Sequence, residues 1–202
     1  TTEVLKKYLI EDEADPNSSN DFGKNIIPNM LNDGMKMYSY TFDGYWKDVG
    51  TLTSLWEANM DILGKNPTFN LYDRKFRIFY RHNALPPHRV GEDAKVKNSM
   101  LTEGCVIDGT VENSVLSNGV IVERGAVVKD SVIMSGAKIC AGAKVEYAII
   151  DSDTVVGAGC QLGEAKETQK LLVLGGGMNI PAGTTLGGGD VIDAKNLKDY
   201  IG

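Results

Sequence analysis

Aliphatic residues recur through the second half of the chain at steps of six residues, and occasionally of five. A small residue stands two positions before most of them, and glycines or other turn-forming residues fill the gaps. This spacing differs from the period of about 3.6 residues of a helix and of about 2 residues of a strand. It predicts hexapeptide repeats wound into a parallel β-helix of about three hexads per coil, with the aliphatic side chains stacked inside. The aliphatic positions are Leu116, Val122, Val128, Met134, Ile139, Val145, Ile150, Val156 and Leu162, and the small positions are Ser114, Ala126, Ala137, Ala143, Ala148, Thr154 and Cys160.

The part of the chain before the repeats has a mixed pattern. Hydrophobic residues alternate over residues 37–42, the Asp-Gly pair at 43–44 is a hairpin-turn signal, and residues 45–48 are the expected return strand. Apolar residues at helical spacing predict a helix over residues 52–63. A looser stretch follows, in which one more short strand is expected over residues 76–80.

Composition and charge narrow the class of protein. The chain has 202 residues and a formal net charge of −6, which argues against nucleic acid as the main partner because phosphate binding needs a basic surface. No apolar run reaches the roughly 20 residues that span a membrane, and the start at Thr1 leads us to expect a fragment of a longer protein. Two of the three cysteines, Cys105 and Cys160, occupy small interior positions of the repeat. We therefore expect buried packing thiols and a reducing, cytoplasmic environment.

The candidate chemistry lies before the predicted helix. Asp48 stands at the end of the expected return strand, two residues after Trp46 and before Val49-Gly50-Thr51. A carboxylate there could hold Mg²⁺, which prefers one or two carboxylates together with substrate phosphates. A solvated aspartate at a strand end is the alternative reading of the same residues. The repeats from residue 96 onward contain no histidine, which argues against the histidine general base that acyltransferases with such repeats commonly use.

Three segments and the repeats that follow them resemble the C-terminal portion of bacterial glucose-1-phosphate adenylyltransferase (ADP-glucose pyrophosphorylase). The segments are residues 20–28, 44–51 and 55–61. The resemblance implies the end of an α/β Rossmann-like nucleotidyltransferase domain at residues 1–65, a linker at 66–90 and a left-handed parallel β-helix at 91–202. It implies a Mg²⁺-dependent enzyme that makes ADP-glucose and pyrophosphate from ATP and glucose 1-phosphate in glycogen synthesis.

The resemblance also implies roles for four residues. Asp48 is similar to the second metal-binding aspartate of the family, and Trp46 to a residue that faces the sugar phosphate. Asp21 and Phe22 correspond to the loop that holds the glucose hydroxyls. Such a reaction needs charge neutralisation and positioning more than acid–base catalysis. The family's glycine-rich nucleotide loop, catalytic arginine and lysine, and first metal aspartate belong to an earlier part of the domain, so we expect this chain alone to be inactive.

The resemblance further implies a tetramer and allosteric control by anionic metabolites. Cations cluster at residues 74–89 of an otherwise acidic chain, and Arg81 or Arg89 is the candidate effector contact because arginine binds phosphate with two donors. A solvated linker that pairs with the acidic N-terminal segment explains the same cluster. Two alternative functions remain at this stage. One is a non-catalytic regulatory subunit of the same complex, and the other is a different sugar-phosphate nucleotidyltransferase with a β-helix tail.

Overall fold

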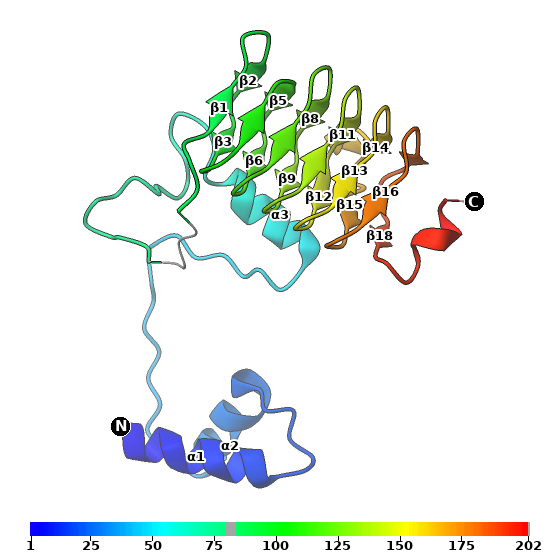
Figure 1. Cartoon of the computed structure of the whole chain (residues 1–202). Helices are drawn as coiled ribbons and strands as arrows, with labels where there is room; N and C mark the ends of the chain where they lie inside the picture. The colour runs from blue at the N-terminus through cyan, green and yellow to red at the C-terminus, as the bar shows by residue number, and fades with distance from the viewer. Residues whose placement is uncertain (80–83, 202) are drawn as a thin grey trace. The chain divides into compact units, whose positions relative to one another are not determined.

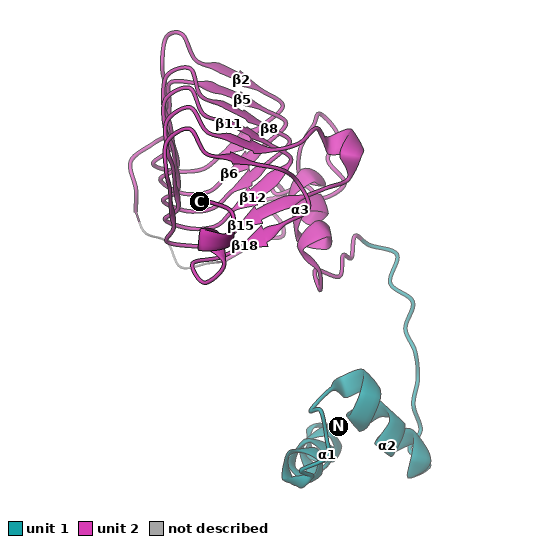
Figure 2. Ribbon diagram, turned by 90° about the vertical axis from the view of Figure 1, so that its right-hand side faces the viewer, with its two compact units in different colours: residues 1–44 teal, residues 45–202 magenta. Residues whose placement is uncertain are grey.

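The computed structural model describes residues 1–79 and 84–201, which divide into two compact units at residues 1–44 and 45–202 (Figure 2). The first unit consists of the helical segments α1 (Thr2–Ala14), η1 (Phe22–Ile26) and α2 (Ile27–Asn32). The Tyr8 hydroxyl of α1 donates a hydrogen bond to Asp33 at the end of α2, over 2.7 Å. The buried Asp12 carboxylate accepts hydrogen bonds from Ser18 and Asn20, which fixes the loop after α1.

The hairpin predicted around residues 43–44 is wrong. Residues 35–48 belong to no helix or strand, and the alternating aromatic residues Tyr38, Tyr40 and Phe42 are 90%, 90% and 61% exposed. An isolated two-stranded hairpin is marginal in water, and residues 38–44, which include the expected turn, are all exposed. The strand predicted at residues 76–80 is also wrong, because residues 76–79 are irregular and Tyr80 lies outside the described residues.

The second unit contains the predicted parallel β-helix, built from three six-stranded parallel sheets (Figure 1). The first sheet contains β1 (Arg89–Val90), β4 (Val106–Ile107), β7 (Ile121–Val122), β10 (Lys138–Ile139), β13 (Val155–Val156) and β16 (Asn179–Ile180). The second sheet contains β2 (Lys95–Lys97), β5 (Thr110–Glu112), β8 (Val127–Lys129), β11 (Lys144–Glu146), β14 (Gln161–Gly163) and β17 (Thr185–Leu186). The third sheet contains β3 (Met100–Leu101), β6 (Val115–Leu116), β9 (Val132–Ile133), β12 (Ala148–Ile150), β15 (Leu172–Leu174) and β18 (Val191–Ile192).

The interior of the β-helix confirms the six-residue rhythm at all but one of the predicted aliphatic positions. Each of the small residues listed above is fully buried, and eight of the nine aliphatic residues are at most 2% exposed. The exception is Met134, which is partly exposed on the outside of the coil, while Ile133 fills the interior position. The step from the interior residue Val128 to the next one, Ile133, is five residues rather than six, because Asp130 turns the chain between them with a left-handed φ of 47°.

The same corner recurs in successive coils and explains the register. Asn98, Asn113, Asp130 and Tyr147 occupy it with φ of 45°, 47°, 47° and 47°. Asparagine and aspartate tolerate this conformation better than most residues. They also form a hydrogen-bonded ladder, in which the Asn98 amide donates to Asn113 over 2.8 Å and the Asn113 amide donates to Asp130. These contacts hold neighbouring coils in register.

A helix covers part of the third sheet. Helix α3 (Leu52–Met60) is capped by Thr51, whose hydroxyl accepts a hydrogen bond from the Ser54 amide, and it ends before the residue 63 expected from the sequence. Trp56 packs with residues on the outer face of the sheet, and its indole Nε1 donates to the backbone oxygen of Asp130 over 2.7 Å. The cluster consists of Trp56, Val132, Tyr147, Ile149, Leu171 and Val173.

The two ends of the β-helix differ. At the C-terminal end, Leu197 of the short helix η3 (Leu197–Asp199) packs against the core. At the N-terminal end, the inward-facing Val90 and Val96 of the first coil remain 46% and 38% exposed. Between β14 and β15 the chain leaves the coil through η2 (Lys166–Thr168), and Lys166 places its ammonium 4.8 Å from the centre of the Trp56 ring.

Candidate functional site

The segment at residues 45–48 carries two of the predicted site residues and lies beside α3 in the second unit. The Tyr45 hydroxyl donates to Asp61 over 3.0 Å, and the Lys47 ammonium lies 2.8 Å from the Glu57 carboxylate and 3.4 Å from that of Asp61. The Glu57 hydrogen bond is the main reason that the pKa of Lys47 is raised, so the lysine is charged at neutral pH. These contacts attach the segment to α3 through alternate side chains.

The other two side chains of this segment, Trp46 and Asp48, are exposed. Tyr45 and Lys47 are half-buried, Trp46 is 75% exposed, and Asp48 is exposed. Successive side chains of an extended chain point to opposite sides, so the two residues that contact α3 leave the other two directed to solvent. The segment therefore exposes both a tryptophan and a carboxylate, although no strand forms there.

Asp21 and Phe22 lie in the first unit. Asp21 caps η1, since its Oδ1 accepts a hydrogen bond from the Lys24 amide over 2.8 Å, and Phe22 is 51% exposed. The structure thus gives the Asp21 carboxylate a structural partner. It brings Asp21 beside Phe22, and Trp46 near Asp48, but each pair belongs to a different unit and no single site containing all four is described.

The donor set for a metal is small. Among the described residues, no three histidine, cysteine, aspartate or glutamate side chains gather in an arrangement that could hold a metal ion. Mg²⁺ is often bound through only one or two carboxylates, with water and substrate phosphates completing its coordination. The exposed Asp48 fits such a partial donor, and other oxygen ligands would have to come from phosphates.

The cationic cluster is only partly described. Arg89 lies in β1, and its guanidinium forms an ion pair with Asp108 on the next coil at 2.7 Å while remaining more than half exposed. Arg74, Lys75 and Arg77 are exposed as well. The second candidate effector contact, Arg81, lies outside the described residues.

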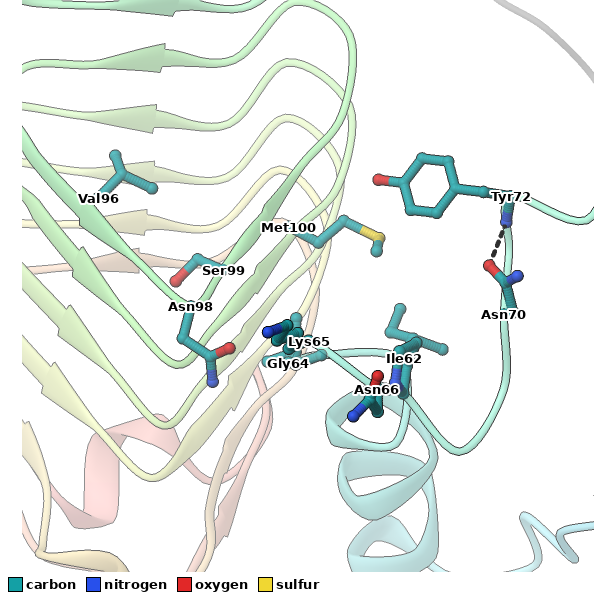
Figure 3. Close-up of a pocket in the computed structure, with 12 residues that line it drawn as sticks. Ile62, Gly64, Lys65, Asn66, Asn70, Tyr72, Val96, Asn98, Ser99 and Met100 are labelled. Atoms are coloured by element: carbon teal, nitrogen blue, oxygen red, sulfur yellow. Dashed lines mark hydrogen bonds between the residues drawn. The ribbon is translucent and has the colours of Figure 1, made fainter.

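A pocket of about 720 Å³ lies between the stretch after α3 and the first coil of the β-helix (Figure 3). Asn98 and Ser99 line it on the coil, opposite Lys65, Asn70 and Tyr72. Its lining contains a lysine and no carboxylate, so it suits neutral or anionic polar ligands better than cations. Sequence reasoning did not identify this pocket. The one available signal was the asparagine at a corner of the repeat, which has a structural explanation as well.

The remaining sequence features behave as packing residues. Cys105 and Cys160 are fully buried, as predicted, and their thiols donate to the backbone oxygens of Ser117 and Pro181. Burial raises the pKa of the Cys105 thiol, which lowers its reactivity. In the described part of the chain no helix combines the length and apolarity needed to cross a bilayer.

Comparison with known proteins gives two family matches in chain order. Residues 1–65 match the nucleotidyl transferase family, and residues 86–172 match the GlmU-like C-terminal hexapeptide family. The parallel β-helix with its hexapeptide repeats agrees with the second match, and the order of the two matches agrees with the resemblance inferred from the sequence.

Curated relatives share one name, glucose-1-phosphate adenylyltransferase. The protein of Clostridium perfringens (strain SM101 / Type A) is 52% identical over 164 residues, which cover 81% of this chain and 42% of that protein. The protein of Desulforamulus reducens is 44% identical over 188 residues, which cover 90% of this chain and 47% of that protein. The chain thus spans less than half the length of these relatives. By sequence and by the order of its two family matches, it is a relative of the glucose-1-phosphate adenylyltransferases, resembling their C-terminal portion.

Proposed function

We propose that residues 45–48 form part of the sugar-phosphate and Mg²⁺ site of a glucose-1-phosphate adenylyltransferase, and that the β-helix is its assembling and regulatory part. The observation that supports this most is the arrangement of Trp46 and Asp48. Both are exposed in a segment whose other two residues contact α3 or the residue that follows it. The name of the relatives, glucose-1-phosphate adenylyltransferase, supports an adenylyl transfer to glucose 1-phosphate. The family resemblance adds that ATP is the donor and that ADP-glucose and pyrophosphate are formed for glycogen synthesis.

The residue types suit that chemistry. Asp48 would hold Mg²⁺ together with substrate phosphates, and the metal would supply charge neutralisation. Trp46 would form an apolar wall beside the sugar phosphate. In the first unit, the Asp21 carboxylate would accept hydrogen bonds from glucose hydroxyls, and the half-exposed Phe22 would line the same sugar.

The test compares this chain with the full-length enzyme that contains it, in a pyrophosphate-release assay. We expect no turnover above a buffer blank from the 202-residue chain, because it carries only the sugar-phosphate half of the expected site. In the full-length enzyme, Asp48→Asn should lower kcat/KM at least about a hundredfold, the usual effect of removing one electrostatic contact to a transition state. Asp43→Asn, a change at an exposed aspartate of the same stretch, is the matched control and should have little effect. Turnover by the chain alone, or an unaffected Asp48→Asn enzyme, would contradict the proposal.

Regulation by an anionic metabolite is the second part of the proposal. Arg89 is exposed on the first coil, and its ion pair with Asp108 leaves part of the guanidinium accessible. In the full-length enzyme, Arg89→Ala and Arg81→Ala should each shift the activator concentration dependence and leave unactivated turnover intact. No shift in either variant removes the effector role.

Assembly through the β-helix is the third part. The first coil exposes inward-facing aliphatic side chains and the unpaired edges of three strands, a combination that favours association. We expect sedimentation to show at least a dimer of this chain, and a monomer at high concentration would contradict that.

If the full-length enzyme preferred another nucleotide to ATP, the alternative of a different sugar-phosphate nucleotidyltransferase would replace the present proposal. An intact complex in which Asp48→Asn changes regulation but not turnover would favour the regulatory-subunit alternative.

A further inference from the structure

Helix α3 is firmly anchored on the β-helix, although the two are far apart in the sequence. Trp56 is 5% exposed, its indole donates to the Asp130 backbone, and its ring meets Tyr147 edge-on, with centroids 4.9 Å apart and an interplanar angle of 86°. Tyr147 adopts a left-handed φ at the corner where the preceding coils have asparagine or aspartate. Such a conformation is unfavourable for a bulky residue, so packing against Trp56 must outweigh its cost.

The segment at residues 45–48 has a weaker anchor, the ring of Tyr45, which lies 5.4 Å from that of Phe69. It belongs to no helix or strand, so ladder hydrogen bonds do not fix its backbone. Its contacts with α3 come instead from the side chains of Tyr45 and Lys47. Lys47 reaches Glu57 within the helix and Asp61 just after it, two positions one turn apart on the same face.

We propose that Lys47 is a positioning residue, which fixes the segment carrying Trp46 and Asp48 to α3 and, through the Trp56 anchor, to the β-helix. Its ammonium is already engaged by the carboxylates of Glu57 and Asp61, so it would act through the segment that it holds. In this view the β-helix supports, through α3, the segment that would bind the sugar phosphate. The proposal rests on the proposed function only for the roles of Trp46 and Asp48.

The geometry explains why lysine suits this position. A single ammonium can donate to two carboxylates at once, whereas each exposed ion pair alone would contribute little. Asp61 accepts from both Lys47 and Tyr45, so the three side chains form one connected network rather than separate pairs. Tyr45 would keep its own contacts with Asp61 and Phe69, so removing the ammonium should loosen residues 46–49 and leave the helix in place.

The test measures ¹⁵N relaxation of this chain and needs no substrate. We expect order parameters near about 0.85 for residues 46–49 in the unmodified chain, and values below about 0.6 in Lys47→Met. Helix α3 and the β-helix should stay rigid in that variant. Lys47→Arg should restore most of the order, and Lys144→Met, at an exposed lysine on β11, should change nothing. In Trp56→Ala, both α3 and residues 46–49 should become mobile.

Two results would overturn the proposal. One is an unchanged order parameter for residues 46–49 in Lys47→Met, and the other is mobility of these residues already in the unmodified chain. In the full-length enzyme, Lys47→Met should lower kcat/KM for glucose 1-phosphate and leave the KM for ATP unchanged. If Asp48→Asn proves harmless while Lys47→Met loosens the segment, the proposed function fails and the positioning role of Lys47 stands.

Discussion

Replacement of Ile133 or Met134 by alanine tests which of two adjacent residues supports the β-helix interior. Ile133 is fully buried and stacks between Leu116 and Ile150 of the neighbouring coils. Met134 is only half-buried and packs near Trp56 on the outside. Truncating a buried isoleucine to alanine costs about 2–5 kcal/mol, and the cost is greatest where the cavity cannot collapse. Hydrogen bonds fix the spacing of coils at about 4.8 Å, so we expect Ile133→Ala to cost about 3–5 kcal/mol.

The outward-facing methionine should matter less. Its side chain keeps contact with solvent, so Met134→Ala should cost about 1 kcal/mol, which is the lost transfer of one or two methylene groups without an interior cavity. Ile133→Val, which removes a single methyl group, should cost about 0.5–1.5 kcal/mol, well below Ile133→Ala. Urea unfolding followed by far-ultraviolet circular dichroism gives the free energies of unfolding, with the m-value as a check that the transition remains cooperative. If Met134→Ala costs more than Ile133→Ala, the assignment of the interior register is refuted.

Two further predictions concern a glycine and an ion pair. A Cβ at Gly163, whose φ is +83°, would lie 1.9 Å from the backbone oxygen of Glu146. Gly163→Ala should therefore force a backbone shift and lower the thermal midpoint of unfolding by several degrees. Gly142→Ala is the control for the left-handed φ alone, because no atom lies within 4 Å of its new Cβ. The Lys138 ammonium, 2.7 Å away, holds the pKa of Glu123 below its ordinary value of 4.5. The stabilisation is therefore complete above the unfolded-state pKa and is lost as the pH falls through the lower folded-state pKa. Thermal unfolding between pH 6 and pH 3 should show a smaller loss of stability below about pH 4.5 in Glu123→Gln than in the unmodified chain, and equal slopes would contradict the assigned pair.

Much of the architecture followed from the sequence because the β-helix is repetitive. Every coil places an aliphatic residue and a small residue in nearly the same surroundings, so the spacing of Val122, Val128 and Ile139 predicts burial without knowledge of distant contacts. The same argument placed Cys105 and Cys160 inside. The functional residues are different. The local pattern suggested Asp48, beside Trp46, as a metal ligand, whereas Asp21 and Phe22 came from the resemblance, and the roles of all four stay predictions.

Tertiary structure decided what local pattern could not. Whether Ile133 or Met134 points inward depends on the left-handed corner at Asp130, which shortens one step of the repeat. Alternation at residues 37–48 suggested a hairpin, but a strand needs a hydrogen-bonded partner strand, and the described chain supplies none there. The attachment of Trp56 to Asp130 joins residues 74 positions apart, and no local pattern encodes such a contact. The sequence alone thus determined the repeating interior, because neighbouring coils make the same contacts at every turn. The attachment of α3 to the outside of the β-helix, and of residues 45–48 to α3, required the folded chain.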